Sequence, residues 1–471
     1  PFWRKTRGSG LLHRARAMST SEGQHGQAGA LQARWPILFL TCAGLFGQFY
    51  AFDNPSALNE QLKLHVASGG ESDPKDYAYH FNLLYTVYSM PNVILPLIMG
   101  VAADRCGCRT LICILAVCVT AGHFVFALGA ELKSWACMIA GRVLFGLGGE
   151  SMQVAQNCLL LKWFQGHEVA FALGVNLSIA RAGSVLNDVL SPVIAEHFGL
   201  TGAIWFGALL CLLSCGCNIT SAWLDRSEGL KANLPDATGD ETVSAKQVLA
   251  MPQQFWLLAA LCVVLYCAIL PFNNIASAFF VETWFSAWPL AEAQQRAGNA
   301  MSVMFLVSAI GTPPFGCLVD RVGKRSVFLT FSSMLLTMSY ASITIFTPIF
   351  SMMCLGVVYT IFAGALWPAF ALTVRRSLLG TAYGVAVALQ NAGLAVVPMW
   401  VGHLQATSGE GKFGGVIRLF MCFGMIAAML SSFIFYTNKT DNGALELPSA
   451  AAERRCAQKL AETASIRERR M

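Results

Sequence analysis

The chain carries one loop sequence twice: GVAADRCGCR at residues 100–109 and GCLVDRVGKR at residues 316–325. Each copy follows a long apolar stretch and precedes another. A glycine-rich, charged turn in each half of an apolar chain indicates a duplicated six-helix unit. Parallel duplication of that kind builds one large class of membrane transporters. The repeat therefore predicts the fold and the broad function together.

The composition supports the same fold. Of 471 residues, 55% are hydrophobic and only 12% are charged, whereas a soluble domain carries about 25% charged residues. Strand-like alternation is absent, so the apolar runs are helices, and a helix that crosses a bilayer needs about 20 such residues. The sequence predicts an all-α polytopic membrane protein with two six-helix halves, whose twelve spans cover residues 36–58, 79–102, 109–129, 135–162, 168–195, 202–224, 253–284, 297–319, 324–346, 349–374, 379–402 and 413–436.

These spans divide the chain into five parts. We expect a cytosolic N-terminal tail at 1–34, a first half at 35–224, a polar cytosolic linker at 225–252, a second half at 253–436 and a charged cytosolic tail at 437–471. The start is rich in Arg and poor in acids, as in an organelle transit peptide, but we favour a disordered tail. Met18 is a candidate initiator.

The basic residues predict the orientation. With a cytosolic N-terminus, 24 of the 32 Lys and Arg residues fall in the tails and the even-numbered loops. This bias follows the positive-inside rule. It places both termini and both copies of the repeated loop in the cytosol. The net charge of +6 is thus explained by the membrane topology, and nucleic-acid binding is a poorer explanation of it.

The repeated loop has a predicted gating or structural role. Its glycines permit a tight turn, its aspartates can accept hydrogen bonds at a neighbouring helix N-terminus, and its basic residues stay on the cytosolic side. We interpret the loop as a conformational latch between the halves, and it resembles the signature loop of the major facilitator superfamily. The candidate latch residues are Asp104, Arg105, Arg109, Asp320, Arg321 and Arg325.

Four charged residues lie within predicted helices 4 and 5. A charge at mid-membrane costs about 2.5–3.5 kcal/mol, so it usually has a partner or a function. Glu150 and Arg181 fall near mid-depth, and Arg142 and Asp188 lie further toward the lumen. The spacing within each helix is near two turns, which keeps the charges roughly on one face. The pattern predicts two acid–base rungs, Glu150–Arg181 and Arg142–Asp188.

A carboxylate and a guanidinium that face one cavity suit a zwitterion. Glu150 would bind an ammonium group and Arg181 a carboxylate. The alternative is a buried structural pair that neutralises itself, and for Arg142–Asp188 we favour such a structural or gating role. Predicted helices 7–12 carry no comparable charge, so the second half should supply neutral groups. Trp367 could form an aromatic wall there or pack in the core.

Several stretches resemble the lysosomal dipeptide uniporters (major facilitator superfamily domain-containing protein 1) over about residues 36–436. They are FDNPSAL at 52–58, GGES at 148–151, AQN at 155–157, SIARAGS at 178–184, ALWP at 365–368, GTAYG at 380–384 and QN at 390–391. The resemblance implies facilitated export of dipeptides, with a preference for cationic ones. It implies that Glu150 holds the peptide amino terminus and Arg181 the carboxyl terminus. Asn157, Trp367 and Gln390 are further substrate-binding candidates.

The resemblance also implies a lysosomal location and a heavily glycosylated single-pass accessory subunit. Leu11-Leu12 is similar to a dileucine sorting signal, but Arg7 stands where an acid is expected, which leaves the plasma membrane as an alternative. Asp188 is outside the family pattern and could favour cationic side chains. Coupling of transport to protons stays open.

Two other functions compete with dipeptide transport. A facilitator of organic anions would need several Arg or Lys residues and no Glu in its cavity. A non-transporting sensor or scaffold is the other possibility. An enzyme is not expected, because no nucleophile–base constellation stands out. Cys106-Gly107-Cys108 lacks partner ligands for a metal, and the sequence predicts no catalytic residue, metal or cofactor.

Overall fold

The computed structural model describes the backbone of residues 8–68, 74–99, 107–164, 167–231, 248–374, 378–407, 413–441, 443–448 and 451. Every regular element in this part of the chain is a helix. The elements are α1 (Gly8–Ala57), α2 (Asn59–Ala67), α3 (Pro74–Ser89), η1 (Pro91–Val93), α5 (Cys108–Glu131), α6 (Trp135–Trp163), α7 (His167–Lys231), α9 (Gln253–Thr283), α10 (Leu290–Val322), α11 (Arg325–Ser342), α12 (Pro348–Thr373), α13 (Leu379–Thr407), α14 (Gly414–Asp441) and η3 (Ala444–Glu446).

The twelve predicted spans are present, and the all-α fold is confirmed. Nine helices of the described chain are long and apolar enough to cross a membrane. One of them, α7, holds two spans, because its backbone breaks at Gly199, where φ is 76°. The helices α6 and α11 supply the other two.

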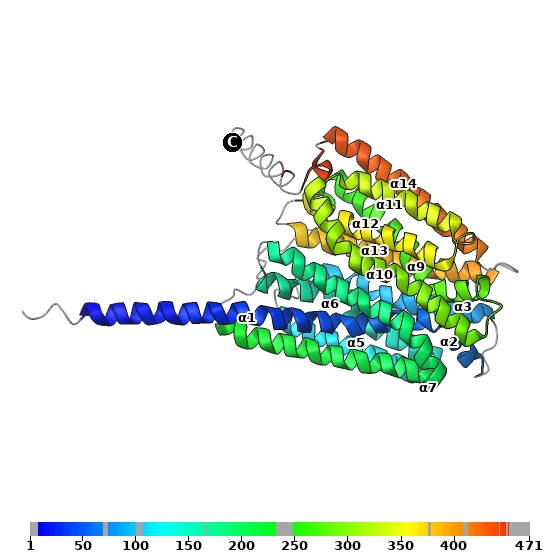
Figure 1. Cartoon of the computed structure of the whole chain (residues 1–471), viewed down its shortest axis with the longest axis horizontal. Helices are drawn as coiled ribbons and strands as arrows, with labels where there is room; N and C mark the ends of the chain where they lie inside the picture. The colour runs from blue at the N-terminus through cyan, green and yellow to red at the C-terminus, as the bar shows by residue number, and fades with distance from the viewer. Residues whose placement is uncertain are drawn as a thin grey trace, which may run out of the picture.

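Two boundaries differ from the predicted ones. The helix α1 begins at Gly8, so the expected disordered tail is instead drawn as a helix that projects from the bundle (Figure 1). At the other boundary α7 continues to Lys231, so the expected linker begins as helix. Residues 232–247 of that linker lie outside the described chain.

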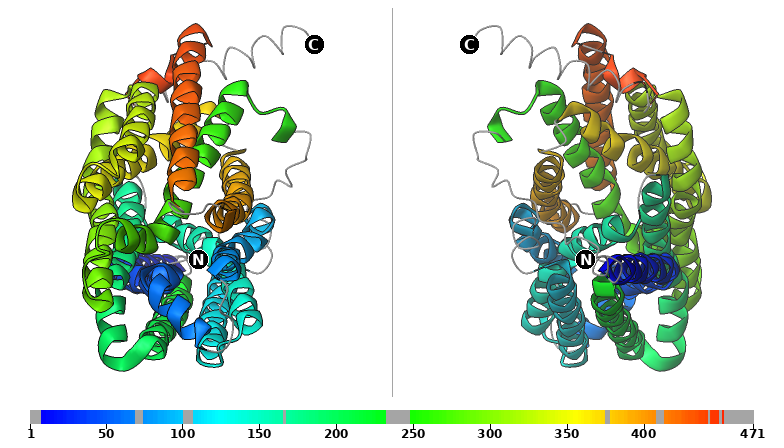
Figure 2. Two further views of the ribbon diagram at one scale, coloured as in Figure 1. Left: turned by 90° about the vertical axis from the view of Figure 1, so that its right-hand side faces the viewer. Right: turned by 90° about the vertical axis from the view of Figure 1, so that its left-hand side faces the viewer.

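The two halves lie one above the other in Figure 1, and Figure 2 views them from both ends. We call the end of the bundle with Gly107 and Gly323 the loop end, and the other end the opposite end. One hydrophobic cluster joins the halves, and it contains Leu58 and Phe81 from the first half with Phe279 from the second. A separate cluster packs the loop end of the first half alone.

Polar contacts between the halves extend from mid-depth to the opposite end. Within the described residues, the Asn82 amide donates to Gln405 Oε1 at 3.2 Å, and Lys63 lies 3.8 Å from Glu282. In Figure 1, α11 and α14 incline away from α1 toward the loop end. Together with the shared core, these contacts close the bundle at the opposite end.

Proline residues determine where α1 accepts hydrogen bonds from other helices. Pro55 lies inside α1 and has no N–H, so the carbonyl of Ala51 lacks its usual partner. The Arg142 guanidinium donates to this carbonyl at 3.4 Å and to that of Phe52 at 3.1 Å. A side-chain donor must replace the missing backbone N–H at membrane depth, because no water is present there to hydrogen-bond the free carbonyl.

The α7–α10 seam between the halves uses two more of these carbonyls. Pro313 in α10 frees the carbonyl of Ala309, and the Ser178 hydroxyl of α7 donates to it at 3.0 Å. Pro192 in α7 frees the carbonyl of Asp188, and Gly298 of α10 lies so close to it that a Cβ atom would collide. Each helix therefore presents a proline-freed carbonyl to the other.

We expect replacement of Arg142 by methionine to destabilise the fold. The guanidinium is fully buried, and its loss leaves the proline-freed Ala51 carbonyl without a donor in an apolar setting. The expected cost is about 3 kcal/mol, measured as a lower apparent Tm in detergent. Arg418→Met is the control, since Arg418 is exposed and its removal should leave the Tm unchanged. Equal Tm values for the two variants would contradict this account of Arg142.

Candidate functional site

Glu150 lies on α6 at mid-depth, beside the contact of this helix with α1. The Gln48 amide on α1 donates to the carbonyl of Gly149 at 2.9 Å, which fixes this turn of α6. Tyr88 on α3 lies close enough to interact electrostatically with the Glu150 carboxylate. Glu150 is half-buried, and no described residue forms a hydrogen bond or ion pair with its carboxylate. The site thus contains a carboxylate without a cationic partner among the described residues.

Arg181 lies on α7 and points across the seam into the second half. Its Nη1 donates to Ser308 Oγ at 2.5 Å and to Thr312 Oγ1 at 2.7 Å, both on α10. The guanidinium carbon lies 4.3 Å from the centre of the Tyr359 ring on α12, in a cation–π arrangement. The side chain is 2% exposed. Its positive charge is therefore held by neutral groups.

The predicted Glu150–Arg181 rung is wrong as an ion pair. No salt bridge joins the two side chains within the described chain. The physical reason is helix packing: α6 packs mainly on α5 and α3, while α7 packs mainly on α1, α10 and α5. The helices α6 and α7 follow each other in sequence, but they touch at only a few points. Neither charge therefore neutralises the other in the described chain.

The predicted Arg142–Asp188 rung is also wrong. Arg142 is bound by the α1 carbonyls described above, and it lies over the rings of Tyr85, Phe126 and Phe145. Asp188 is bound by the side-chain amide of its neighbour Asn187, at 3.2 Å. Both residues remain candidates for a structural or gating role.

Trp367 forms part of an aromatic row in the second half. Its Nε1 donates to the Tyr266 hydroxyl at 3.3 Å, and its backbone carbonyl accepts from the Tyr383 hydroxyl at 3.0 Å. The Tyr266 ring lies 6.3 Å from that of Tyr359, the ring beneath Arg181. The row therefore begins at the Arg181 guanidinium and ends at Tyr383, so Trp367 belongs to a wall beside the site.

The two amide candidates lie in different surroundings. Asn157 is half-buried on α6, two turns from Glu150 in sequence. Gln390 on α13 is 3% exposed and accepts a long hydrogen bond of 3.9 Å from the Cys262 thiol on α9. Gln390 thus contacts the interior of the second half, and the role of both residues in substrate binding stays a prediction.

The first copy of the repeated loop binds the end of α7. Gly107 has the left-handed φ of 77° that the tight turn requires, and Arg109 forms an ion pair with Asp225. Lys162 and the Trp163 indole also reach this carboxylate, at 3.3 and 2.6 Å. Asp225 is 1% exposed, although the sequence places it in a polar linker. Asp104 and Arg105 lie outside the described residues.

The second copy binds the segment after α14 instead. Gly323 has a φ of 73°, and a Cβ atom there would collide with Leu447. Arg325 lies 3.5 Å from Asp320 and donates to the Leu447 carbonyl at 2.9 Å. Arg321 ends α10. In the described chain, each copy thus holds the last part of its own half, which differs from the predicted latch between halves.

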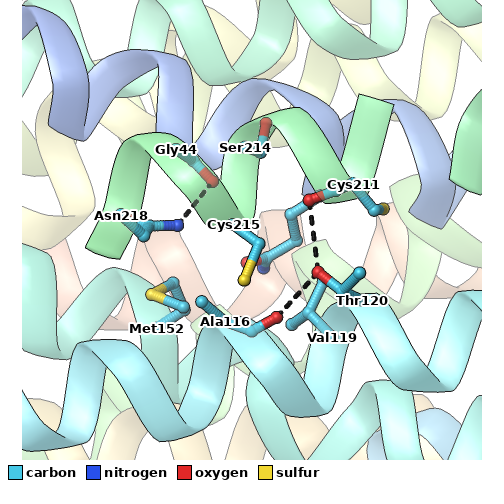
Figure 3. Close-up of a pocket in the computed structure, with 10 residues that line it drawn as sticks. Gly44, Ala116, Val119, Thr120, Met152, Cys211, Ser214, Cys215 and Asn218 are labelled. Carbon is cyan, nitrogen blue, oxygen red and sulfur yellow. Dashed lines mark hydrogen bonds between the residues drawn. The ribbon is translucent and has the colours of Figure 1, made fainter. Parts of the chain in front are cut away.

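A small cavity lies inside the first half, among α1, α5, α6 and α7 (Figure 3). It is lined by polar and sulfur-containing side chains, among them Thr120, whose hydroxyl donates to the Cys211 carbonyl at 3.2 Å, and Asn218, which donates to the Gly44 carbonyl at 3.0 Å. Gln48 separates it from the Glu150 turn. It is a packing void within one half, distinct from the seam.

Sequence reasoning missed four residues of these networks: Ser308, Thr312, Tyr359 and Asp225. The first three are neutral, and no charge in the sequence distinguishes them. One usable signal existed for Tyr359, which stands eight residues before Trp367 and hence on nearly the same face of α12. The part of the chain that the structure describes holds no cluster of three or more potential metal ligands.

The chain is similar to known transporters in sequence. The family model for the Major Facilitator Superfamily matches residues 35–289. The lysosomal dipeptide transporter MFSD1 of Bos taurus is 35% identical over 405 residues, which cover 81% of this chain and 83% of the relative. The protein of that name from Homo sapiens is 34% identical, with coverage of 80% and 81%. The one from Gallus gallus is 32% identical, with coverage of 92% and 91%.

Solved structures resemble it in fold. The nucleoside transporter NupG superposes with a TM-score of 0.64 at 14% identity, covering 84% of this chain and all of that one. A D-xylose–proton symporter superposes with a TM-score of 0.65, also at 14% identity, with coverage of 84% and 96%. At this identity the likeness supports the arrangement of the helices alone.

Proposed function

Because the chain belongs to the major facilitator superfamily, and within it to the family of the lysosomal dipeptide transporter MFSD1, we propose that it carries dipeptides across the lysosomal membrane to the cytosol. The chain is a multi-pass membrane transporter and not an enzyme. The proposal concerns its cargo, its direction and its mode of action, which we take to be uniport by alternating access.

One observation carries the choice of cargo: Glu150 and Arg181 do not neutralise each other. Neither charge has an ionic partner in the described chain. Such charges are costly at membrane depth unless a ligand supplies the opposite charge to each. A dipeptide brings an ammonium group for Glu150 and a carboxylate for Arg181. An organic anion could satisfy Arg181 only and would leave Glu150 uncompensated, so a zwitterion fits the pair better.

The partners of Arg181 suggest how binding is linked to the halves. Ser308 and Thr312 belong to the second half, and they occupy the Nη1 donor that an incoming carboxylate would share. The buried Nε has no partner and is free for a second contact. A carboxylate bound there bridges α7 and α10. Its binding energy can therefore change the stability of the contact between these helices, which must rearrange during transport.

The aromatic row supports a preference for cationic side chains. Tyr359, Tyr266, Trp367 and Tyr383 present ring faces and hydroxyl groups next to the Arg181 site. A Lys or Arg side chain of the cargo can lie against such faces at a gain of about 0.5–2 kcal/mol.

The bias of basic residues orients the carrier. It places the loop end in the cytosol and the opposite end in the lumen, so the structure is the lumen-closed form. The lysosome is the proposed membrane because it is named for the relatives, and the plasma membrane is the alternative. A glycosylated single-pass partner, expected from the family, stays a prediction.

Counterflow in proteoliposomes tests the cargo. Vesicles preloaded with a dipeptide should accumulate labelled Lys-Ala faster than labelled Ala-Ala, with no accumulation of lactate, nitrate or glycerol phosphate in parallel vesicles. Protein-free liposomes are the control for leakage. Accumulation of an anion together with indifference to every dipeptide would contradict the proposal and favour an anion facilitator.

A further inference from the structure

Two carboxyl groups, Asp53 on α1 and Asp188 on α7, lie buried together near the opposite end of the seam. Asp53 is 2% exposed and Asp188 is fully buried. They are the sequence neighbours of two asparagines that hydrogen-bond each other, since Asn54 Nδ2 donates to Asn187 Oδ1 at 3.2 Å. The two carboxyl groups interact electrostatically. The binding of a dipeptide by Glu150 and Arg181 does not use them.

The groups around this pair supply one positive charge for two carboxyls. From α9 and α10, the residues with printed contacts in the described chain are the neutral Asn273 and Gly298, while His123 of α5 faces Arg142 rather than the acids. Tyrosines are uncharged at neutral or acidic pH. The titratable and charged groups that face the pair are Tyr50 from α1, Tyr85 and Tyr88 from α3, and Arg142 from α6.

The hydrogen bonds around Asp188 do not compensate a negative charge. Its Oδ1 accepts from the Asn187 amide, and its buried Oδ2 has no partner. From the second half, Asn273 donates to Asp53 at 3.3 Å, while its own Oδ1 is buried without a partner. Arg142 is already shared with the α1 carbonyls. An ionised carboxylate with one neutral donor is strongly disfavoured at membrane depth.

We propose that Asp53 and Asp188 form a proton-binding site that holds one proton when the carrier is closed at this end. Two like-charged carboxyls at close range share a proton, since both cannot ionise at an acceptable cost. With one proton bound, the remaining negative charge matches the single charge of Arg142.

The second half covers the site, which links the proton to the gate. Asn273 of α9 bonds to Asp53, and Gly298 of α10 packs against the Asp188 carbonyl. Separation of the halves at this end removes both contacts and admits water, in which both carboxyls can ionise. An acidic medium on this side therefore favours closure, by up to about tenfold per pH unit for one linked proton.

The proton shifts the equilibrium between the open and closed forms, but it is not transported across the membrane. Both side chains are buried when this end is closed, so the proton enters and leaves from the same side. If this side is the lumen, as the proposed orientation has it, lumenal acidity drives the carrier toward the form that faces the cytosol. The carrier stays a uniporter whose gate senses pH.

The distance between fluorophores at positions Leu132 and Ile345 reports whether the opposite end is open or closed. These residues are 63% and 71% exposed on loops of different halves at this end, and unnatural amino acids allow labelling beside the native cysteines. In nanodiscs without peptide, acidification from pH 7.5 to 5.0 should raise the ratio of closed to open native protein at least about tenfold. Asp188→Asn should be closed at both pH values. Glu196→Gln, an exposed change further along α7, should behave as the native protein.

Three results would overturn the proposal: a full pH response in Asp188→Asn, no response in the native protein, or closure driven equally by 100 mM Na⁺ at pH 7.5. Should Asp188→Asn fail to fold, Asp53→Asn and the apparent Tm provide the second test. The native Tm should rise on acidification, whereas the Tm of Asp53→Asn should not. Because no peptide is present, the result is independent of whether dipeptides are the cargo.

Discussion

Replacing Arg181 by alanine reduces dipeptide counterflow by at least about 100-fold. The substrate carboxylate then enters a buried site without its cation, and removal of one member of a buried charged pair costs about 3–5 kcal/mol. The loss should be larger than for any other single substitution in the seam, since Ser308 and Thr312 cannot replace a positive charge. Initial rates in proteoliposomes at matched protein density provide the measurement.

Two further variants separate charge from shape. Arg181→Lys keeps the charge but loses the planar fork, so we expect it to recover part of the activity and to remain about tenfold below the native rate. Arg296→Ala removes an exposed arginine of α10, 43% exposed and paired with Glu292, and should transport normally. Equal flux through the native protein and Arg181→Ala would exclude Arg181 from the cargo site.

Replacing Glu150 by glutamine removes the distinction between free and amino-blocked peptides. The native protein should transport Lys-Ala about 10- to 100-fold faster than N-acetyl-Lys-Ala, because a hydrogen bond to a charged group contributes about 1.5–3 kcal/mol. In Glu150→Gln both peptides should move at the same low rate. The comparison is a cycle of two proteins and two ligands, so it isolates the contact between Glu150 and the ammonium group.

Glu292→Gln is the matched control, since Glu292 is an exposed acid on α10, and it should keep the native discrimination. Thermal unfolding should show that Glu150→Gln is folded, because no described residue depends on this carboxylate for an ion pair. Discrimination against the acetylated peptide that persists in Glu150→Gln would assign the amino terminus to another residue.

Sequence predicted the features of the fold and the site that a repeated motif or a charge within an apolar run makes visible. The repeated loop predicted that the chain divides into two halves. Its glycines allow the left-handed backbone at Gly107 and Gly323. Glu150 and Arg181 were identifiable because a charge within an apolar run is costly and therefore informative. Arg181 lies in the seam and Glu150 on α6 within the first half, and the roles of both residues stay predictions.

The parts that sequence could not supply depend on which helices touch. The two predicted rungs assumed that α6 and α7 pack along their length because they are consecutive, whereas these helices touch at only a few points. Arg181 thus finds Ser308 on α10, a neutral residue some 130 positions away. Asp225 shows the same limit at a boundary: its charge suggested a solvated linker, but three side chains bury it at the end of α7.

The proline-freed carbonyls of the α7–α10 seam affect how the sequence can vary. The contacts at Ala309 and Asp188 are made by backbone oxygens, so they do not depend on the side chains at those positions. What they require is Pro192 and Pro313, which free the oxygens, and the absence of a side chain at Gly298. Relatives can therefore exchange the acid at position 188, and with it any sensitivity to protons, while the two halves keep the same register.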